Sequence, residues 1–189
     1  MVKVGDSIPS IPLVEGLPDN KIDLASELAS GSGIIIGVPA AFSKSASELK
    51  LWTQSPINCE ASVQRNQHGV IANEFAGPTC TDSHIPGFIA HPKLKSAGKV
   101  FVVSVNDSFV MSAWGKSLDK DASSGIRFLG DPSGEFTRAL DVEFAAAPLL
   151  GTNRSKRYAM VVEGGKVKSI SVEPDNTGAT VSTAEKILG

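Results

Sequence analysis

The chain has 189 residues, of which 41% are hydrophobic and 20% charged, with a formal net charge of -2. This size and composition are typical of one globular domain with a full core. The balanced charge, without a Lys/Arg block, argues against a nucleic-acid partner. The apolar run at 34–36 is too short to span a bilayer, and the first residues lack signal-peptide features. We therefore expect a cytoplasmic protein with no membrane partner.

The first part of the chain is expected to lead into a buried strand. Residues 1–33 are turn-rich because prolines punctuate them, and residues 22–28 are predicted to form a short helix that Asp23 caps. The β-branched run at 33–39 is typical of a strand buried on both faces. Residues 44–77, in contrast, show no sustained helix or strand period, and a loop of that length needs a special explanation.

Strands and helices alternate over the rest of the chain. Strands are predicted at 99–105, 126–129, 157–162 and 166–172, and helices at 81–88, 108–116, 135–140 and 182–188. Phe109 and Trp114 have core spacing in their helix, and Ser182 is the expected cap of the last one. Glu163-Gly164-Gly165 predicts a hairpin between the last two strands. This order predicts an α/β fold with a mixed central sheet flanked by helices.

One cysteine, Cys80, carries most of the functional prediction. It stands directly before the predicted helix at 81–88. A thiol at a helix N-terminus meets the positive end of the helix dipole and free backbone N–H groups, which favour the thiolate. Such a thiolate can attack a peroxide oxygen and become a sulfenic acid, which another thiol must reduce. The residues alone leave open the alternative of an inert, half-buried cysteine.

Several stretches of the chain match one known family. They are Pro78-Thr79-Cys80-x-x-x-His84-x-Pro86-Gly87-Phe88, Gly37–Ser43, Ser104–Asp107, Arg127–Asp131 and Arg157-Tyr158-Ala159. Together they resemble the peroxiredoxins, specifically the type II or peroxiredoxin 5 subfamily. The resemblance covers nearly the whole chain outside 44–77. It implies a thioredoxin-like fold, in agreement with the α/β order read from the sequence.

The resemblance implies a role for four residues. Cys80 matches the attacking cysteine, and Arg127 matches the catalytic arginine, whose fixed charge would stabilise the thiolate and the peroxide. Pro39 matches the proline that shields the thiolate from water, and Ser43 matches the hydroxyl that hydrogen-bonds the peroxide. The implied activity is a thiol peroxidase for hydrogen peroxide and alkyl hydroperoxides, which needs no metal, haem or flavin cofactor.

The resemblance also bears on the partners. Plant relatives often place a second cysteine where this chain has Val102 and Val103. Outside 44–77 the chain thus corresponds to a one-cysteine peroxiredoxin. Its sulfenic acid would be reduced by an external thiol, either glutathione with glutaredoxin or thioredoxin. The family further implies a homodimer formed through the face near the active site. A disulfide between Cys59 and Cys80 stays open for the chain as written.

The chain departs from the family pattern between Ser43 and Cys80. Family members place the hydroxyl residue three positions before the cysteine, whereas residues 44–79 intervene here. Removing 44–77 restores the motif, and codons at both ends of this segment can contain splice-site sequences. We therefore interpret 1–189 as a single domain with an insertion at 44–77. A translated intron and a lineage-specific insertion are the two explanations.

Two further functions stay open at this level. The insertion could leave a catalytically impaired peroxiredoxin-like binding protein or holdase, and the distinguishing feature is whether Ser43 and Cys80 still converge. A zinc site could be formed by Cys59, His68, Cys80 and His84. The zinc site is disfavoured because the chain has no Cys-x-x-Cys pair.

Overall fold

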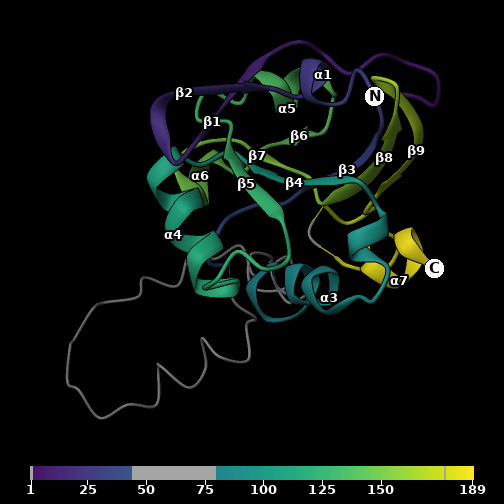
Figure 1. Ribbon diagram of the computed structural model, residues 1–189. Coiled ribbons are helices and arrows are strands. Elements are labelled where there is room, and N and C mark those ends of the chain that lie inside the picture. Colours follow the sequence, from purple (N-terminus) through teal and green to yellow (C-terminus); the bar gives the residue numbers. More distant parts are fainter. Residues whose placement is uncertain (1, 44–79, 177) are drawn as a thin grey trace.

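The computed structural model describes residues 2–43, 80–176 and 178–189 and is built around a seven-stranded sheet (Figure 1). Its strands are β1 (Pro12–Glu15), β2 (Leu17–Asp23), β3 (Ser32–Gly37), β4 (Lys99–Ser104), β5 (Ile126–Gly130), β8 (Tyr158–Glu163) and β9 (Lys166–Val172). They lie in the order β2-β1-β5-β4-β3-β8-β9. The short strands β6 (Glu143–Phe144) and β7 (Arg154–Ser155) pair with each other.

Strands of both directions make up this sheet. The central strands β3, β4 and β5 run parallel, whereas β8 runs antiparallel to β3, and β1 to β5. The hairpin of β8 and β9 turns at Gly164 and Gly165, whose φ angles of +58° and +72° favour glycine. The predicted mixed sheet and glycine hairpin are therefore confirmed.

Helices cover both faces of the sheet (Figure 1). They are α1 (Leu24–Glu27), α3 (Ile85–Ala90), α4 (Ser108–Leu118), α5 (Glu135–Ala139), α6 (Ala147–Leu150) and α7 (Ala184–Leu188), with a π-helical turn η1 (Cys80–His84) and a 3-10 turn η2 (Leu94–Ser96). Asp23 and Asp107 cap α1 and α4 through their carboxylates, and the predicted cap at Asp23 is confirmed. No helix in the described part of the chain is long and apolar enough to cross a bilayer.

The pleat of the sheet sorts side chains between two cores. In the register of the parallel strands, Ile35, Phe101 and Arg127 are neighbours, and so are Ile36, Val102 and Phe128. Ile35 and Phe101 belong to the core that includes α1 and α5 residues. The second row belongs to the opposite core, which contains residues of α3, α4 and α7 together with Cys80. The parity of a strand residue thus decides whether it faces the cysteine.

The structure corrects several local predictions. The extended, turn-rich lead expected at 1–33 forms the β1–β2 hairpin at the sheet edge, where its prolines are tolerated. In α4, Phe109 is 60% exposed, and the buried side is formed instead by Met111 and Trp114 with Ser108 and Gly115.

Two helix starts also differ from the prediction. The helix expected at 81–88 is split, because α3 begins at Ile85, one residue before Pro86, and a π-helical turn precedes it. Ser182 does not cap α7, whose N-cap position is Thr183. The Ser182 hydroxyl instead donates to the Glu173 carboxylate. The expected insertion at 44–77 lies outside the described residues.

Candidate active site

Cys80 begins the π-helical turn η1 and is completely buried. Its backbone N–H donates to the Ser43 Oγ at 3.3 Å, so the two ends of the intervening segment meet. The next residue, Thr81, accepts a hydrogen bond from the Trp114 Nε1 at 3.0 Å, which ties η1 to α4. Trp114 is itself fully buried, in agreement with its prediction as a core residue. Ser43 and Cys80 therefore converge, which is the feature that argues against a site disrupted by the insertion.

The loop that carries Pro39 and Ser43 is fixed to the carboxyl edge of the sheet. Val38 donates its backbone N–H to the Val103 carbonyl, and Pro39 is buried. The Asn106 Oδ1 accepts from the Ala41 backbone N–H at 3.1 Å. These bonds hold the loop beside Asn106, at the sheet edge where parallel strands commonly present functional groups.

Arg157 is the cation that the structure places beside the thiol. Its Nη1 donates to the Cys80 Sγ at 3.2 Å, and the residue is only 2% exposed. The register explains this position: Tyr158 pairs with Gly37, so Arg157 lies just past the end of β3. Its backbone donates to Asn176 and accepts from Glu173. A buried guanidinium at this distance gives the Cys80 sulfur a charge-assisted hydrogen bond.

His84 contacts the same guanidinium from the other side. Its Nδ1 lies 3.1 Å from the Arg157 Nη1, and its Nε2 lies 2.9 Å from the Ser182 carbonyl oxygen. Guanidinium only donates and a carbonyl only accepts, so the ring is neutral, with its proton on Nε2. Burial, with a contribution from the Arg157 charge, lowers the pKa of His84 to about 4. His84 therefore stays uncharged at neutral pH.

Glu173 holds the chain segment that His84 contacts. Its buried carboxylate accepts hydrogen bonds from the backbone N–H groups of Thr180, Val181 and Ser182 and from the hydroxyls of Thr180 and Ser182. Burial alone would raise the pKa of Glu173, but these bonds to the ionised form lower it to about 2. The carboxylate is therefore charged across the neutral range and fixes Ser182 in place.

Arg127, the arginine that the sequence assigned to the site, lies elsewhere. Its guanidinium donates to both carboxylate oxygens of Glu15, at 2.9 and 2.6 Å, and forms a second ion pair with Glu27. It stacks over the Phe101 ring at 5.3 Å and so faces the α1–α5 core, opposite Cys80. It also stands near the amino end of β5, away from the edge that carries Ser43. The prediction that Arg127 adjoins the thiol is therefore wrong.

A signal for Arg157 was present in the sequence. It immediately precedes the strand at 158–163, and the hairpin containing this strand matched the family. Only the pairing of β8 with β3 shows that this position meets the cysteine loop. His84 stands in the family motif around Cys80, but its role depends on a contact with Ser182, 98 positions away. The role of Glu173 likewise depends on its contact with Ser182, nine positions away.

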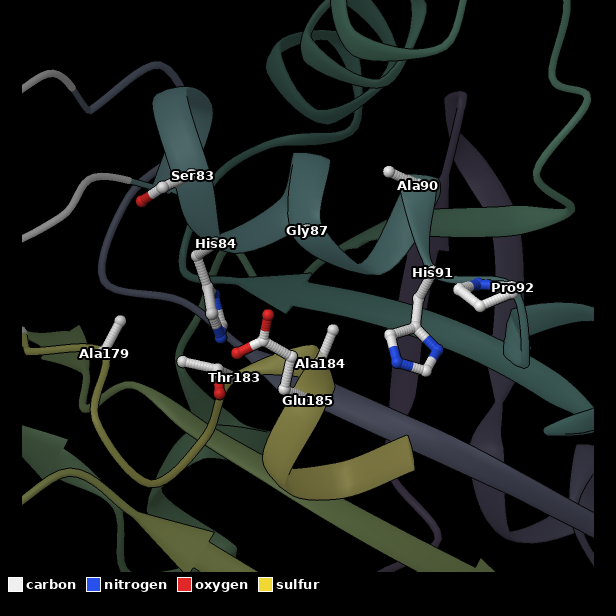
Figure 2. Close-up of a pocket in the computed structure, with 10 residues that line it drawn as sticks. All are labelled: Ser83, His84, Gly87, Ala90, His91, Pro92, Ala179, Thr183, Ala184 and Glu185. Carbon is white, nitrogen blue, oxygen red and sulfur yellow. The ribbon is translucent and has the colours of Figure 1, made fainter. Parts of the chain in front are cut away.

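A pocket of about 510 Å³ opens beside the site, between α3 and α7. Figure 2 shows its lining residues, with His84 and His91 extending from two ends of one helical segment. Cys80 does not line it. The zinc hypothesis gains no support: Cys59 and His68 lie outside the described residues, and no group of three metal-binding side chains occurs among the residues described. Cys80 and His84 share Arg157 as a partner instead.

Known proteins resemble the chain over most of its length. The family model described as Redoxin matches residues 3–188. Peroxisomal membrane associated protein 20 of Schizosaccharomyces pombe is 37% identical, with 100% of this chain and 98% of that protein covered. Peroxiredoxin-2D of Arabidopsis thaliana is 43% identical over 59% of this chain and 68% of its own length.

Solved structures show the same relationship. Peroxiredoxin 5 from Alvinella pompejana is 32% identical, with a TM-score of 0.66 and 94% of each chain covered. Reduced Prx3 from Vibrio vulnificus in complex with H2O2 is 28% identical, with a TM-score of 0.72 over 100% of this chain and 98% of that one. The thioredoxin-like peroxiredoxin fold expected from the sequence is confirmed.

Proposed function

The chain belongs to the peroxiredoxins of the redoxin family, close to the type II and peroxiredoxin 5 members, and we propose that it reduces hydrogen peroxide and alkyl hydroperoxides through Cys80. The observation that carries this proposal is the buried Cys80 Sγ with the Arg157 Nη1 at 3.2 Å and Ser43 at its backbone N–H. The Vibrio vulnificus relative holds H2O2 in its structure, which supports a peroxide as substrate.

The oxidative step uses the thiolate as nucleophile. Cys80 Sγ attacks one peroxide oxygen, the S–O bond forms and the O–O bond breaks, and the other oxygen leaves as water or an alcohol after taking a proton. Arg157 is a fixed cation that stabilises the negative charge passing from sulfur to the leaving oxygen. The Ser43 oxygen accepts from Cys80, so its own O–H is able to donate to a peroxide oxygen. Buried Pro39 excludes water from the thiolate.

The reductive steps need thiols from outside the described residues. One thiol condenses with the Cys80 sulfenic acid, forming a mixed disulfide and releasing water, and a second thiol displaces Cys80 as a free thiol. Cys80 is the free cysteine of the described chain, and Cys59 lies outside it. We propose glutathione with glutaredoxin, or thioredoxin, as the donor, and a reducing compartment such as the cytoplasm as the location.

Trapping of the sulfenic acid tests the activity. The full chain is treated with one equivalent of hydrogen peroxide and a sulfenic-acid trap, and its intact mass is measured. An adduct that forms on wild type and is absent from Cys80→Ser supports the proposal. An inert Cys80 in the full chain contradicts it, and recovery of reactivity in a variant lacking 44–77 would assign the chemistry to the shorter form.

A coupled assay identifies the reductant. Peroxide consumption is followed with thioredoxin and its reductase, and separately with glutaredoxin and glutathione. Turnover in one system and not in the other selects the donor. Turnover in neither, with Cys80 still oxidised by peroxide, would overturn both candidate donors while leaving the nucleophile assignment intact.

The proposal includes a homodimer through the face near the site. Phe42, beside Ser43, is 46% exposed, and Phe109 at the start of α4 is 60% exposed. The Ala41–Asn106 hydrogen bond brings the segments carrying these two rings together. Exposed aromatic rings of this kind are enriched in interfaces. A dimer in sedimentation experiments that dissociates in Phe109→Glu supports this interface, and a wild-type monomer contradicts it.

A further inference from the structure

We propose that His84 is a positioning residue, which holds the Arg157 guanidinium against Cys80 and is itself held by Ser182 and Glu173. This inference rests on the proposed function, since it concerns the reactivity of the same thiol. A single guanidinium nitrogen, the Arg157 Nη1, lies 3.2 Å from the Cys80 Sγ and 3.1 Å from the His84 Nδ1. Any movement of the imidazole therefore alters the contact of the cation with the sulfur.

The ring is suited to this task because it is a neutral acceptor. The charged and titratable groups around it are Arg157 and Cys80 on one side, Glu173 through Ser182, and Glu185 across the pocket. A charged imidazolium would repel the guanidinium and would lose its acceptor on Nδ1. Neutral His84 accepts from Arg157 and adds no positive charge beside the guanidinium.

The orientation of the ring is set by a rigid support. Its Nε2–H donates to the Ser182 carbonyl at 2.9 Å, and the Phe88 ring packs against it edge-on at 5.5 Å. Ser182 is immobilised because both its backbone N–H and its hydroxyl donate to the Glu173 carboxylate, at 2.9 and 2.8 Å. Glu173 also donates its backbone N–H to the Arg157 carbonyl. One residue, Glu173, thus supports the histidine through its carboxylate and Ser182, and the arginine through its own backbone N–H.

Three substitutions of His84 separate its two hydrogen bonds. His84→Asn keeps an acceptor near Nδ1 for Arg157 and loses the donor to Ser182. His84→Gln keeps a donor near Nε2 for Ser182 and loses the acceptor for Arg157. His84→Phe loses both while keeping the ring volume and the contact with Phe88. His91→Phe is the matched control, since His91 lines the same pocket and its Nδ1 accepts a hydrogen bond from the Lys93 backbone N–H.

Two readouts are used for each variant: the rate constant of Cys80 oxidation by peroxide, and the pH midpoint of Cys80 alkylation by iodoacetamide. We expect His84→Phe and His84→Gln to slow oxidation by about 10- to 100-fold and to move the alkylation midpoint to higher pH. His84→Asn should recover most of the rate. His91→Phe should stay within about 2-fold of wild type.

The outcomes distinguish this inference from the proposed function. If peroxide fails to oxidise wild-type Cys80, the proposed function fails, and the alkylation midpoint still reports whether His84 tunes the thiol. If wild type is oxidised and His84→Phe keeps both the rate and the midpoint, the positioning role is refuted.

A measurement on the wild-type chain avoids variants that fail to fold. The ¹⁵N shifts of the His84 ring should show a neutral imidazole with the proton on Nε2 down to about pH 5.5, given its pKa of about 4. A ring protonated on Nδ1 at pH 7 would overturn the inference.

Discussion

Two arginines on opposite faces of one sheet show how position decides what a cation can do. Arg127 is half-buried, paired with the carboxylates of Glu15 and Glu27, and its charge is neutralised where it lies. Arg157 is buried and donates to a thiol and a neutral imidazole. The ion pairs raise the pKa of Arg127, which marks a structural charge satisfied by its own partners. Arg157, which donates to the sulfur itself, is placed to stabilise charge that develops there during a reaction.

The two arginines also connect different elements of the fold. Arg127 joins strand β1 and helix α1 to β5 through partly exposed carboxylates. Arg157 joins the cysteine turn to the start of β8, with its backbone paired to Asn176 and Glu173. The first connection contributes to stability at the surface, and the second contributes to the arrangement of reacting groups.

The largest expected effect comes from removing the Arg157 charge. Arg157→Met should slow formation of the Cys80 sulfenic acid by about 100- to 1000-fold, because a preorganised cation is lost from a buried site. Arg157→Lys should recover only part of the rate, since an ammonium does not reproduce the planar fork. Stopped-flow measurement of thiol oxidation checks both variants. Arg127→Met is the control, and its oxidation rate should stay within about 2-fold of wild type. Equal losses of rate in Arg157→Met and Arg127→Met would contradict the different roles of the two arginines.

The stability contributed by buried His84, beside Arg157, should also depend on pH. The pKa of His84 is about 4 in the folded chain and 6.5 in the unfolded one, so the unfolded state binds more protons between these values. The stabilisation that comes from neutral His84 should therefore be fully present above about pH 6.5. The free energy of unfolding should fall by about 3 kcal/mol as the pH drops to 4. Urea unfolding across this range measures the slope. His84→Phe should flatten it, and Arg127→Met should keep it.

Protonation of Glu173 should lower the free energy of unfolding further, at lower pH. Its folded pKa of about 2 lies below its ordinary value of 4.5, so its stabilisation is present above pH 4.5 and disappears as the pH falls toward 2. Glu173→Gln should weaken this lower step, and because the Glu173 charge raises the pKa of His84, it should also move the His84 step to lower pH. A variant that retains the full lower step would show that another carboxylate causes it.

The smallest expected effect belongs to the surface pair. Arg127→Met should lower the free energy of unfolding by about 1 kcal/mol, because a partly exposed ion pair gains little over hydrated charges. Most of this difference should vanish at about 1 M salt, where screening is strong. Urea denaturation at two salt concentrations measures it. A salt-independent loss of several kcal/mol would mean that the stacking of Arg127 on Phe101 matters more than its charge.

The sequence by itself determined the alternation of strands and helices, the hairpin at Gly164-Gly165 and the identity of Cys80 as the candidate nucleophile. These features depend on local chemistry: β-branched runs, turn glycines, capping aspartates, and a thiol at the start of a helical segment. The short motifs around Cys80 and Ser43 were enough to indicate the family.

Only the tertiary structure decided which arginine meets the thiol and what supports it. Arg127 and Arg157 both lie within predicted strands, at 126–129 and 157–162, but strand order and register place them on opposite faces and at opposite ends of the sheet. Phe109 had the spacing of a core residue and is exposed, because the packed side of α4 is set by Met111 and Trp114. His84, Ser182 and Glu173 are brought together by chain segments far apart in sequence, and no local pattern specifies such contacts.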